Sequence, residues 1–182
     1  MNINEISEKL AEDFKTIDAQ SRNVLKILIC GSHLGDDKKH IADFRDRVRD
    51  ELKVPGAFLM EDIEVEGTPE LHQKFDLIWN LMLKGDNVPL CIVFAGETGD
   101  KSVGLNVEIG DIAKDSEKKP HTSIIRLKGV KLATHAEEFP CYTVEDPEDF
   151  KRVGISIIQA KIEEIKSFLL YRSRKGGKNE RK

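Results

Sequence analysis

The chain has 182 residues, of which 39% are hydrophobic and 34% charged, and its formal net charge is −4. This composition indicates one globular domain with a full hydrophobic core, and it argues against a strongly basic, nucleic-acid-binding body. No apolar run in the sequence reaches the length of a membrane-spanning helix.

The first third of the chain predicts two helices and two strands. Residues 4–19 carry apolar side chains at helical spacing, which predicts a helix leading into the domain. Residues 24–31 form an almost continuous apolar run that ends at Gly31, a pattern typical of a strand buried on both faces. A helix over 36–52 and a short strand over 56–60 follow.

The rest of the chain continues the same alternation. Pro69 suits the first turn of a helix. Pro140 has no N–H to donate, so the last strand is expected at or near an edge of the sheet. We expect helices over 69–83, 103–113 and 147–171, and strands over 88–96, 122–127 and 140–144.

Strands that alternate with helices predict parallel pairing through right-handed crossovers. We therefore expect a doubly wound α/β fold, Rossmann-like or flavodoxin-like, with a mostly parallel five-stranded sheet in the order 2-1-3-4-5. A single domain would span residues 1–171, with its core at 24–145 and extra helices at 4–19 and 147–171. The basic segment 172–182 lacks apolar residues and is expected to be a disordered tail. A solubilising role for it is favoured over contact with a polyanion.

Cysteines and the first residues bear on location and cofactors. Cys30, Cys91 and Cys141 lie in apolar stretches, which is typical of buried thiols in a reducing compartment. The opening "MNINEISEKLAEDF" lacks the basic and apolar regions of a secretory signal, so a cytoplasmic location is expected. No histidine or cysteine cluster has metal-ligand spacing, so neither a metal nor another cofactor is predicted.

Two glycine-containing loops, "CGSHLGDD" and "AGETGDKSVG", follow the first and third strands. With the expected strand order they line one crevice at the carboxyl ends of the strands, where open parallel sheets bind ligands. Glycines let backbone N–H groups approach an anion, and a helix N-terminus adds a positive dipole. The candidate substrate-binding residues are Gly31, Ser32, His33, Ser102 and Gly104, and the hydroxyls of Ser32 and Ser102 are the candidate donors to a phosphate. Alternatively, these turns hold no ligand and Ser102 only caps its helix.

Two acidic residues are candidates for catalysis. Glu108 follows Ser102 by six positions and can face the crevice, and Gly104 one turn earlier leaves space above its carboxylate. Asp76 lies among the apolar residues of the helix expected over 69–83. The alternatives are that Glu108 is a solvated residue in the first turns of a helix, and that Asp76 lies on the solvent side of its own.

Three segments of the chain resemble the nucleoside 2-deoxyribosyltransferase-like superfamily, and most closely its 2′-deoxynucleoside 5′-phosphate N-hydrolases. They are "ILICGS", "FDLIWNLMLKGDNVPLCIVF" and "SVGLNVEIG". The resemblance implies that Glu108 is the nucleophile that attacks the anomeric carbon of the sugar, and that Asp76 orients the substrate or protonates the leaving base. Serine at position 102 resembles the hydrolases that accept a 5′-phosphate, whereas the transferases tend to have aspartate there.

The function implied by this resemblance is cleavage or exchange of the N-glycosidic bond of a (deoxy)nucleoside 5′-monophosphate or a nucleoside. The resemblance also implies a homodimer. Two alternatives stay open: an enzyme that cleaves NAD, and a non-catalytic module that binds a nucleotide as a signal. The base, the sugar and the need for a 5′-phosphate are left open by the sequence.

Overall fold

The computed structural model of the chain describes residues 3–32, 34–64, 67, 70–99, 101–132 and 134–176. All four strand pairings in its sheet are parallel, and the order is β2-β1-β3-β4-β5, which confirms the predicted fold class. The strands are β1 (Leu25–Gly31), β2 (Ala57–Leu59), β3 (Val88–Ala95), β4 (Thr122–Leu127) and β5 (Cys141–Val144). The helices are α1 (Ile3–Val24), α2 (Asp37–Asp50), α3 (Leu71–Met82), α4 (Val103–Lys114) and α5 (Pro147–Gly176), with short 3-10 helices η1 (Met60–Asp62), η2 (Lys119–His121) and η3 (Thr134–Glu138).

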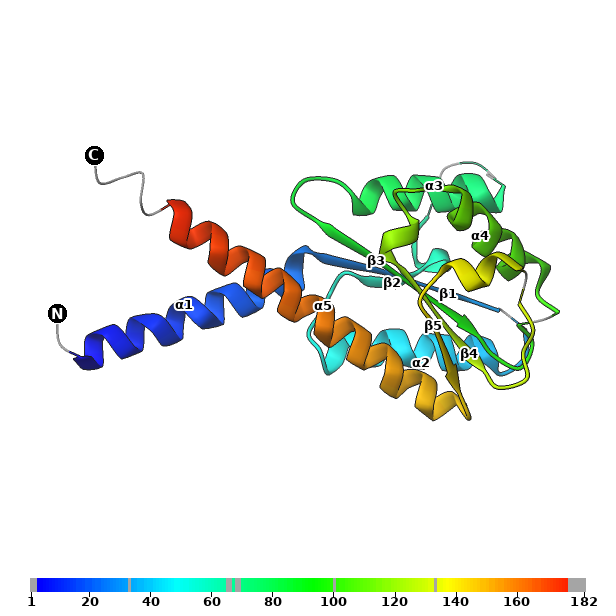
Figure 1. Ribbon diagram of the computed structural model, residues 1–182, viewed down its shortest axis with the longest axis horizontal. Coiled ribbons are helices and arrows are strands. Elements are labelled where there is room, and N and C mark those ends of the chain that lie inside the picture. The colour runs from blue at the N-terminus through cyan, green and yellow to red at the C-terminus, as the bar shows by residue number, and fades with distance from the viewer. Residues whose placement is uncertain are drawn as a thin grey trace.

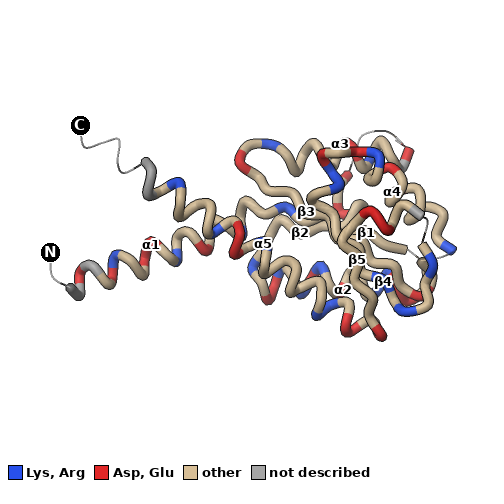
Figure 2. The backbone as a smooth tube through the Cα atoms, in the orientation of Figure 1, with Lys and Arg blue, Asp and Glu red and all other residues tan. Residues whose placement is uncertain are grey.

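Helices cover both faces of the sheet, with α2 and α5 on one side and α3 and α4 on the other (Figure 1). Alternate residues of each strand point to opposite faces, which divides the core into two layers. Ile27 of β1 belongs to the layer of Phe44 and Phe150, whereas Leu28 belongs to the layer of Ile78. Charged residues lie mainly on the helices and loops, and β3 at the centre carries none (Figure 2).

The first helix is longer than predicted. It continues from the expected end at residue 19 to Val24 and leads directly into β1. Two contacts lie within its last turns. The Ser21 hydroxyl donates to the carbonyl of Asp18, and Arg22 pairs with the Asp18 carboxylate at 2.9 Å. Lys166 of α5 also contacts Asp18, at 2.5 Å, and with Arg22 it lowers the pKa of that carboxyl to about 2.

The last helix is also longer than predicted. Segment 172–182 was expected to be disordered, but α5 continues to Gly176, and residues 177–182 lie outside the described part of the chain. The Arg172 guanidinium lies 5.6 Å from the centre of the Phe168 ring, and the Ser173 hydroxyl donates to the carbonyl of Leu170. The contact between Arg172 and Phe168 joins side chains four positions apart, the spacing at which side chains stabilise an exposed helix. Its end and α1 run side by side away from the sheet (Figure 1).

The edge position predicted for the last strand is confirmed, since β5 pairs only with β4 in this sheet. Pro140 takes part as an acceptor, because its carbonyl receives the N–H of Ile124. Among the described residues, no helix has both the length and the apolar character needed to cross a membrane.

Replacement of either of two helical glycines by alanine should change the stability of the protein, with opposite signs at the two positions. A Cβ at Gly154 of α5 would lie 2.4 Å from the Phe44 ring, which is itself held against Phe150. Gly154→Ala should therefore destabilise the protein by about 1–3 kcal/mol. A Cβ at Gly110 of α4 would meet no atom within 4 Å, so Gly110→Ala should stabilise by up to about 1 kcal/mol. Urea unfolding measures the free energy of unfolding of the two variants. Equal changes in that free energy would contradict the close packing at Gly154.

Candidate active site

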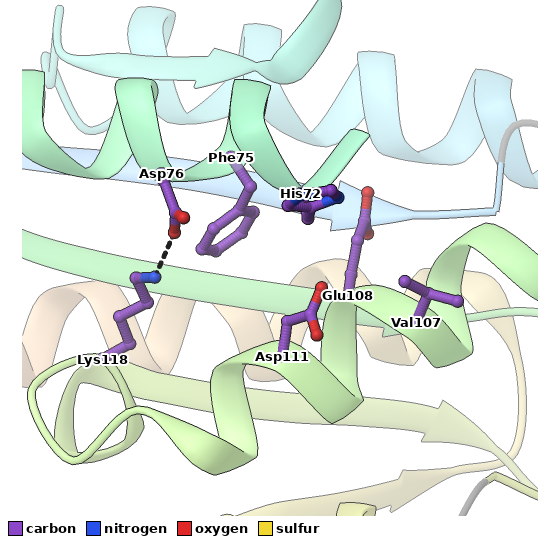
Figure 3. A pocket seen from close by; sticks show the side chains of 7 residues that line it. All are labelled: His72, Phe75, Asp76, Val107, Glu108, Asp111 and Lys118. Carbon is purple, nitrogen blue, oxygen red and sulfur yellow. Dashed lines mark hydrogen bonds and ion pairs between the residues drawn. The ribbon is translucent and has the colours of Figure 1, made fainter. Parts of the chain in front are cut away.

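A pocket of about 480 Å³ lies between α3 and α4. Both predicted acids, Asp76 from α3 and Glu108 from α4, are on its walls, so the fold brings together two side chains that the sequence separates by 32 positions. Figure 3 shows the α3 residues facing the α4 residues across this space. The described residues that line it are His72, Phe75, Asp76, Val107, Glu108, Asp111 and Lys118.

Glu108 lies in the second turn of α4 and is nearly buried, with 6% of its surface exposed. Its neighbours Leu105 and Ile109 pack into the core, which fixes the orientation of this part of the helix. The Glu108 Oε2 atom is buried and has no hydrogen-bond partner. Burial without compensation raises the pKa of this carboxyl to about 7. The alternative that Glu108 is a solvated residue is therefore wrong.

The charge of Glu108 acts on a buried thiol of the strand β1. A hydrogen bond with Cys91 and burial raise the pKa of the Cys30 thiol, and the charge of Glu108 raises it further. Cys30 is the last residue but one of β1, so the charge of Glu108 acts on the carboxyl end of that strand, where parallel sheets bind their ligands. Glu108 is thus held in a poorly solvated position where its ionisation is unfavourable.

Asp76 is in a different electrostatic environment. Its carboxylate accepts a hydrogen bond from the Lys118 ammonium (Figure 3), and the same ammonium lies 3.0 Å from Asp115. The Asp76 side chain is 56% exposed, as the alternative of a solvent-side position expected, and it borders the pocket without being enclosed.

Lys118 is a site residue that the sequence analysis missed. Its side chain is only 11% exposed, and its ammonium lies 5.5 Å from the centre of the Phe75 ring. Burial lowers the pKa of Lys118, but the hydrogen bonds with Asp76 and Asp115 outweigh it, and the pKa lies above its ordinary value. In "DSEKKPH" no local signal distinguishes Lys118 from the neighbouring Lys119, because the partner that selects it is 42 positions away.

The loops predicted to bind phosphate are held together by an acid of the chain itself. The Asp37 carboxylate at the start of α2 accepts the N–H groups of Glu97 and Thr98, at 3.0 and 2.9 Å. It also accepts the Thr98 hydroxyl at 2.5 Å, and it is 2% exposed. Gly96 is required next to it, since a Cβ there would overlap the carboxylate. Asp37 therefore occupies the donors that an anion would use after β3.

Of the other predicted substrate-binding residues, those that the structure describes are not among the residues that line the pocket. Ser32 is fully buried and shares a 2.5 Å hydrogen bond with the Thr98 hydroxyl. Ser102 is the N-cap of α4 and accepts the N–H of Leu105, as the alternative interpretation expected. A Cβ at Gly31 would contact the side chain of Ile41. Gly104 is half-buried in the first turn of α4, and His33 lies outside the described residues.

Carboxylates dominate the charge of the pocket. Of the described lining residues, Asp76, Glu108 and Asp111 are acidic, and Lys118 is already shared between two carboxylates. Within the same part of the chain, no group of three or more His, Cys, Asp and Glu side chains is arranged to hold a metal ion. The chemistry available is that of carboxylates, with Glu108 poised to change its charge near neutral pH.

The chain matches no protein-family model, and neither a curated protein nor a solved structure is significantly similar to it. The family resemblance of its motifs therefore stays a prediction. The function has to be argued from the pocket.

Proposed function

We propose that this chain is an N-glycosidase-type enzyme that cleaves or exchanges the N-glycosidic bond of a nucleoside or its 5′-monophosphate, with Glu108 as the attacking carboxylate. The observation that carries the proposal is the buried, unpartnered carboxylate of Glu108 on the wall of a pocket. Retaining a poorly solvated acid without a partner opposes stability, and such groups cluster at functional sites. The resemblance of "SVGLNVEIG" to the nucleoside 2-deoxyribosyltransferase-like superfamily supports the same residue and role.

The reaction would proceed as a double displacement. The Glu108 carboxylate attacks the anomeric carbon, the bond from that carbon to the base nitrogen breaks, and the base leaves with the electron pair. Water then attacks the same carbon in hydrolysis, or a second base does so in exchange, and Glu108 is released as a carboxylate. Because Asp76 is paired with Lys118, we assign it the positioning of a sugar hydroxyl instead of protonation of the base.

The test is release of free base from a panel of nucleosides and nucleoside monophosphates. Glu108→Gln keeps the size of the side chain but cannot attack, so we expect it to lower the rate about a thousandfold or more. Glu137→Gln makes the same chemical change at an exposed position outside the pocket and should retain the wild-type rate. Equal release by wild type and Glu108→Gln would exclude the proposed nucleophile.

A second candidate is a module that binds a nucleotide or nucleoside without cleaving it. It is favoured by the ion pair between Asp76 and Lys118, because this contact already engages the carboxyl that the family resemblance assigns to the substrate. The helices α1 and α5 extend together beyond the sheet (Figure 1). In such a module they would bind a partner protein and transmit to it whether the pocket holds a ligand. A ligand-induced rise in melting temperature without any product would distinguish this module from the enzyme.

A further inference from the structure

The charge of the pocket bears on which substrate it accepts. Asp76, Glu108 and Asp111 face one space from two helices (Figure 3). Lys118 is already bound to Asp76 and Asp115, and Lys114, which lies 3.7 Å from Asp111, has a largely exposed side chain. A positive ligand would enter a region of excess negative charge, whereas a phosphate dianion would be repelled by it.

Three hydrogen-bond donors of the loops after β1 and β3 are already engaged within the described part of the chain. The N–H groups of Glu97 and Thr98 are bound to the Asp37 carboxylate, and the Ser32 hydroxyl is engaged with Thr98. A phosphate would have to displace a buried carboxylate of the chain to reach these groups. Two separate parts of the structure, the walls of the pocket and the loops beside it, thus argue against a phosphorylated substrate.

Leaving-group chemistry points in the same direction. A neutral purine or pyrimidine leaves as an anion unless an acid protonates it, and such assistance supplies about 100- to 10,000-fold. In this pocket Asp76 is ion-paired, Glu108 is needed as the nucleophile, and His72 is half-exposed with its Nδ1 atom 3.4 Å from the carboxylate of Glu70. A base that already carries a positive charge, such as a pyridinium or an N-alkylated purinium, accepts the electron pair of the breaking bond and leaves as a neutral molecule. It needs no proton from the protein.

We propose that the pocket between α3 and α4 selects nucleosides whose base is cationic and whose sugar carries no 5′-phosphate. This inference rests on the proposed function and narrows it to a substrate class. In the reaction, Glu108 forms a bond to the anomeric carbon as the bond to the cationic nitrogen breaks, and the neutral base departs. Water then cleaves the glycosyl ester, which frees the sugar, restores Glu108 and releases one proton to solvent.

The experiment compares kcat/KM of the full chain for four probes: nicotinamide riboside, 7-methylguanosine, nicotinamide mononucleotide and uncharged inosine. We expect the two cationic nucleosides to exceed inosine by about 100-fold or more, the lower range of general acid assistance that inosine would lack. We expect nicotinamide riboside to exceed the mononucleotide by about tenfold, because the phosphate is repelled.

A charge variant tests the origin of the selectivity. Asp111→Lys replaces a half-exposed carboxylate on the pocket wall by a cation. It should lower the ratio of riboside to mononucleotide rates by about tenfold or more. Glu137→Lys, which makes a comparable change away from the pocket, should leave the ratio unchanged and so controls for net charge.

The outcomes separate the two proposals. Release of base from inosine or from the mononucleotide at rates equal to or above those of the cationic nucleosides would overturn the substrate class and leave the glycosidase proposal standing. An unchanged ratio in Asp111→Lys would overturn the electrostatic origin of the selectivity. Release of base from none of these probes or of the wider nucleotide panel would overturn the glycosidase proposal and the inference with it.

Discussion

Glu108→Gln should make the protein more stable at pH 8 by up to about 3 kcal/mol, because it removes a buried charge. The pKa of Glu108 is about 7 in the folded protein, against an ordinary value of 4.5. The folded state therefore holds this proton more tightly than the unfolded chain does. As the pH rises above about 4.5, the unfolded chain ionises first, and the stability contributed by the protonated carboxyl falls until the pH exceeds about 7.

The effect is measured by thermal or urea unfolding of wild type and Glu108→Gln at pH 5 and pH 8. For a chain of this size, about 3 kcal/mol corresponds to a rise of about 6–12 °C in Tm at pH 8, with little difference at pH 5. Glu137→Gln provides the control at an exposed position. Parallel pH profiles for wild type and Glu108→Gln would show that the carboxyl is not poorly solvated.

This stabilisation should come with loss of turnover, since the same carboxylate is the proposed nucleophile. A residue that opposes stability while serving catalysis is a common trade-off at active sites. If Glu108→Gln gained stability and also kept full activity, the buried carboxyl would have to serve some purpose other than nucleophilic attack.

Asp37→Ala should destabilise the protein by about 3 kcal/mol or more, because it removes a buried acceptor of three hydrogen bonds. The N–H groups of Glu97 and Thr98 and the Thr98 hydroxyl would lose their partner. Alanine leaves space beside Gly96, but a methyl group offers nothing to accept these donors. The loss should be localised, because Asp37 joins the start of α2 to the loop after β3.

The neighbouring Asp36 offers a matched control. Asp36 is exposed and its side chain makes no capping hydrogen bond at the start of α2. Asp36→Ala should therefore change the stability by less than about 0.5 kcal/mol. Urea unfolding measures both variants, and amide hydrogen exchange should show faster exchange at Glu97 and Thr98 in Asp37→Ala alone. Equal destabilisation by the two variants would contradict the role assigned to Asp37.

Several features of the fold followed from the sequence alone. The strand β3, which has no charged residue, was predicted within one residue of its observed bounds, because a strand covered on both faces needs apolar side chains at every position. The parallel pairing followed from the alternation of helices and strands, and the observed order β2-β1-β3-β4-β5 is one of the orders that a doubly wound sheet adopts. Helical spacing indicated that Glu108 could face the crevice, because that property depends on local periodicity. Asp76 was selected as a charge among apolar residues and by the family resemblance of its segment, and both residues line one cavity.

Only the tertiary structure decided how the site is charged and which donors are free. Asp37 meets Glu97 across 60 positions of chain, and Lys118 meets Asp76 across 42. No periodic pattern in the sequence predicts such contacts, because they depend on the positions of loops that belong to different crossover connections. The raised pKa of Glu108 also depends on the tertiary structure. The sequence shows a glutamate beside apolar residues, but its carboxyl is desolvated only by the side chains that pack around it in the folded protein.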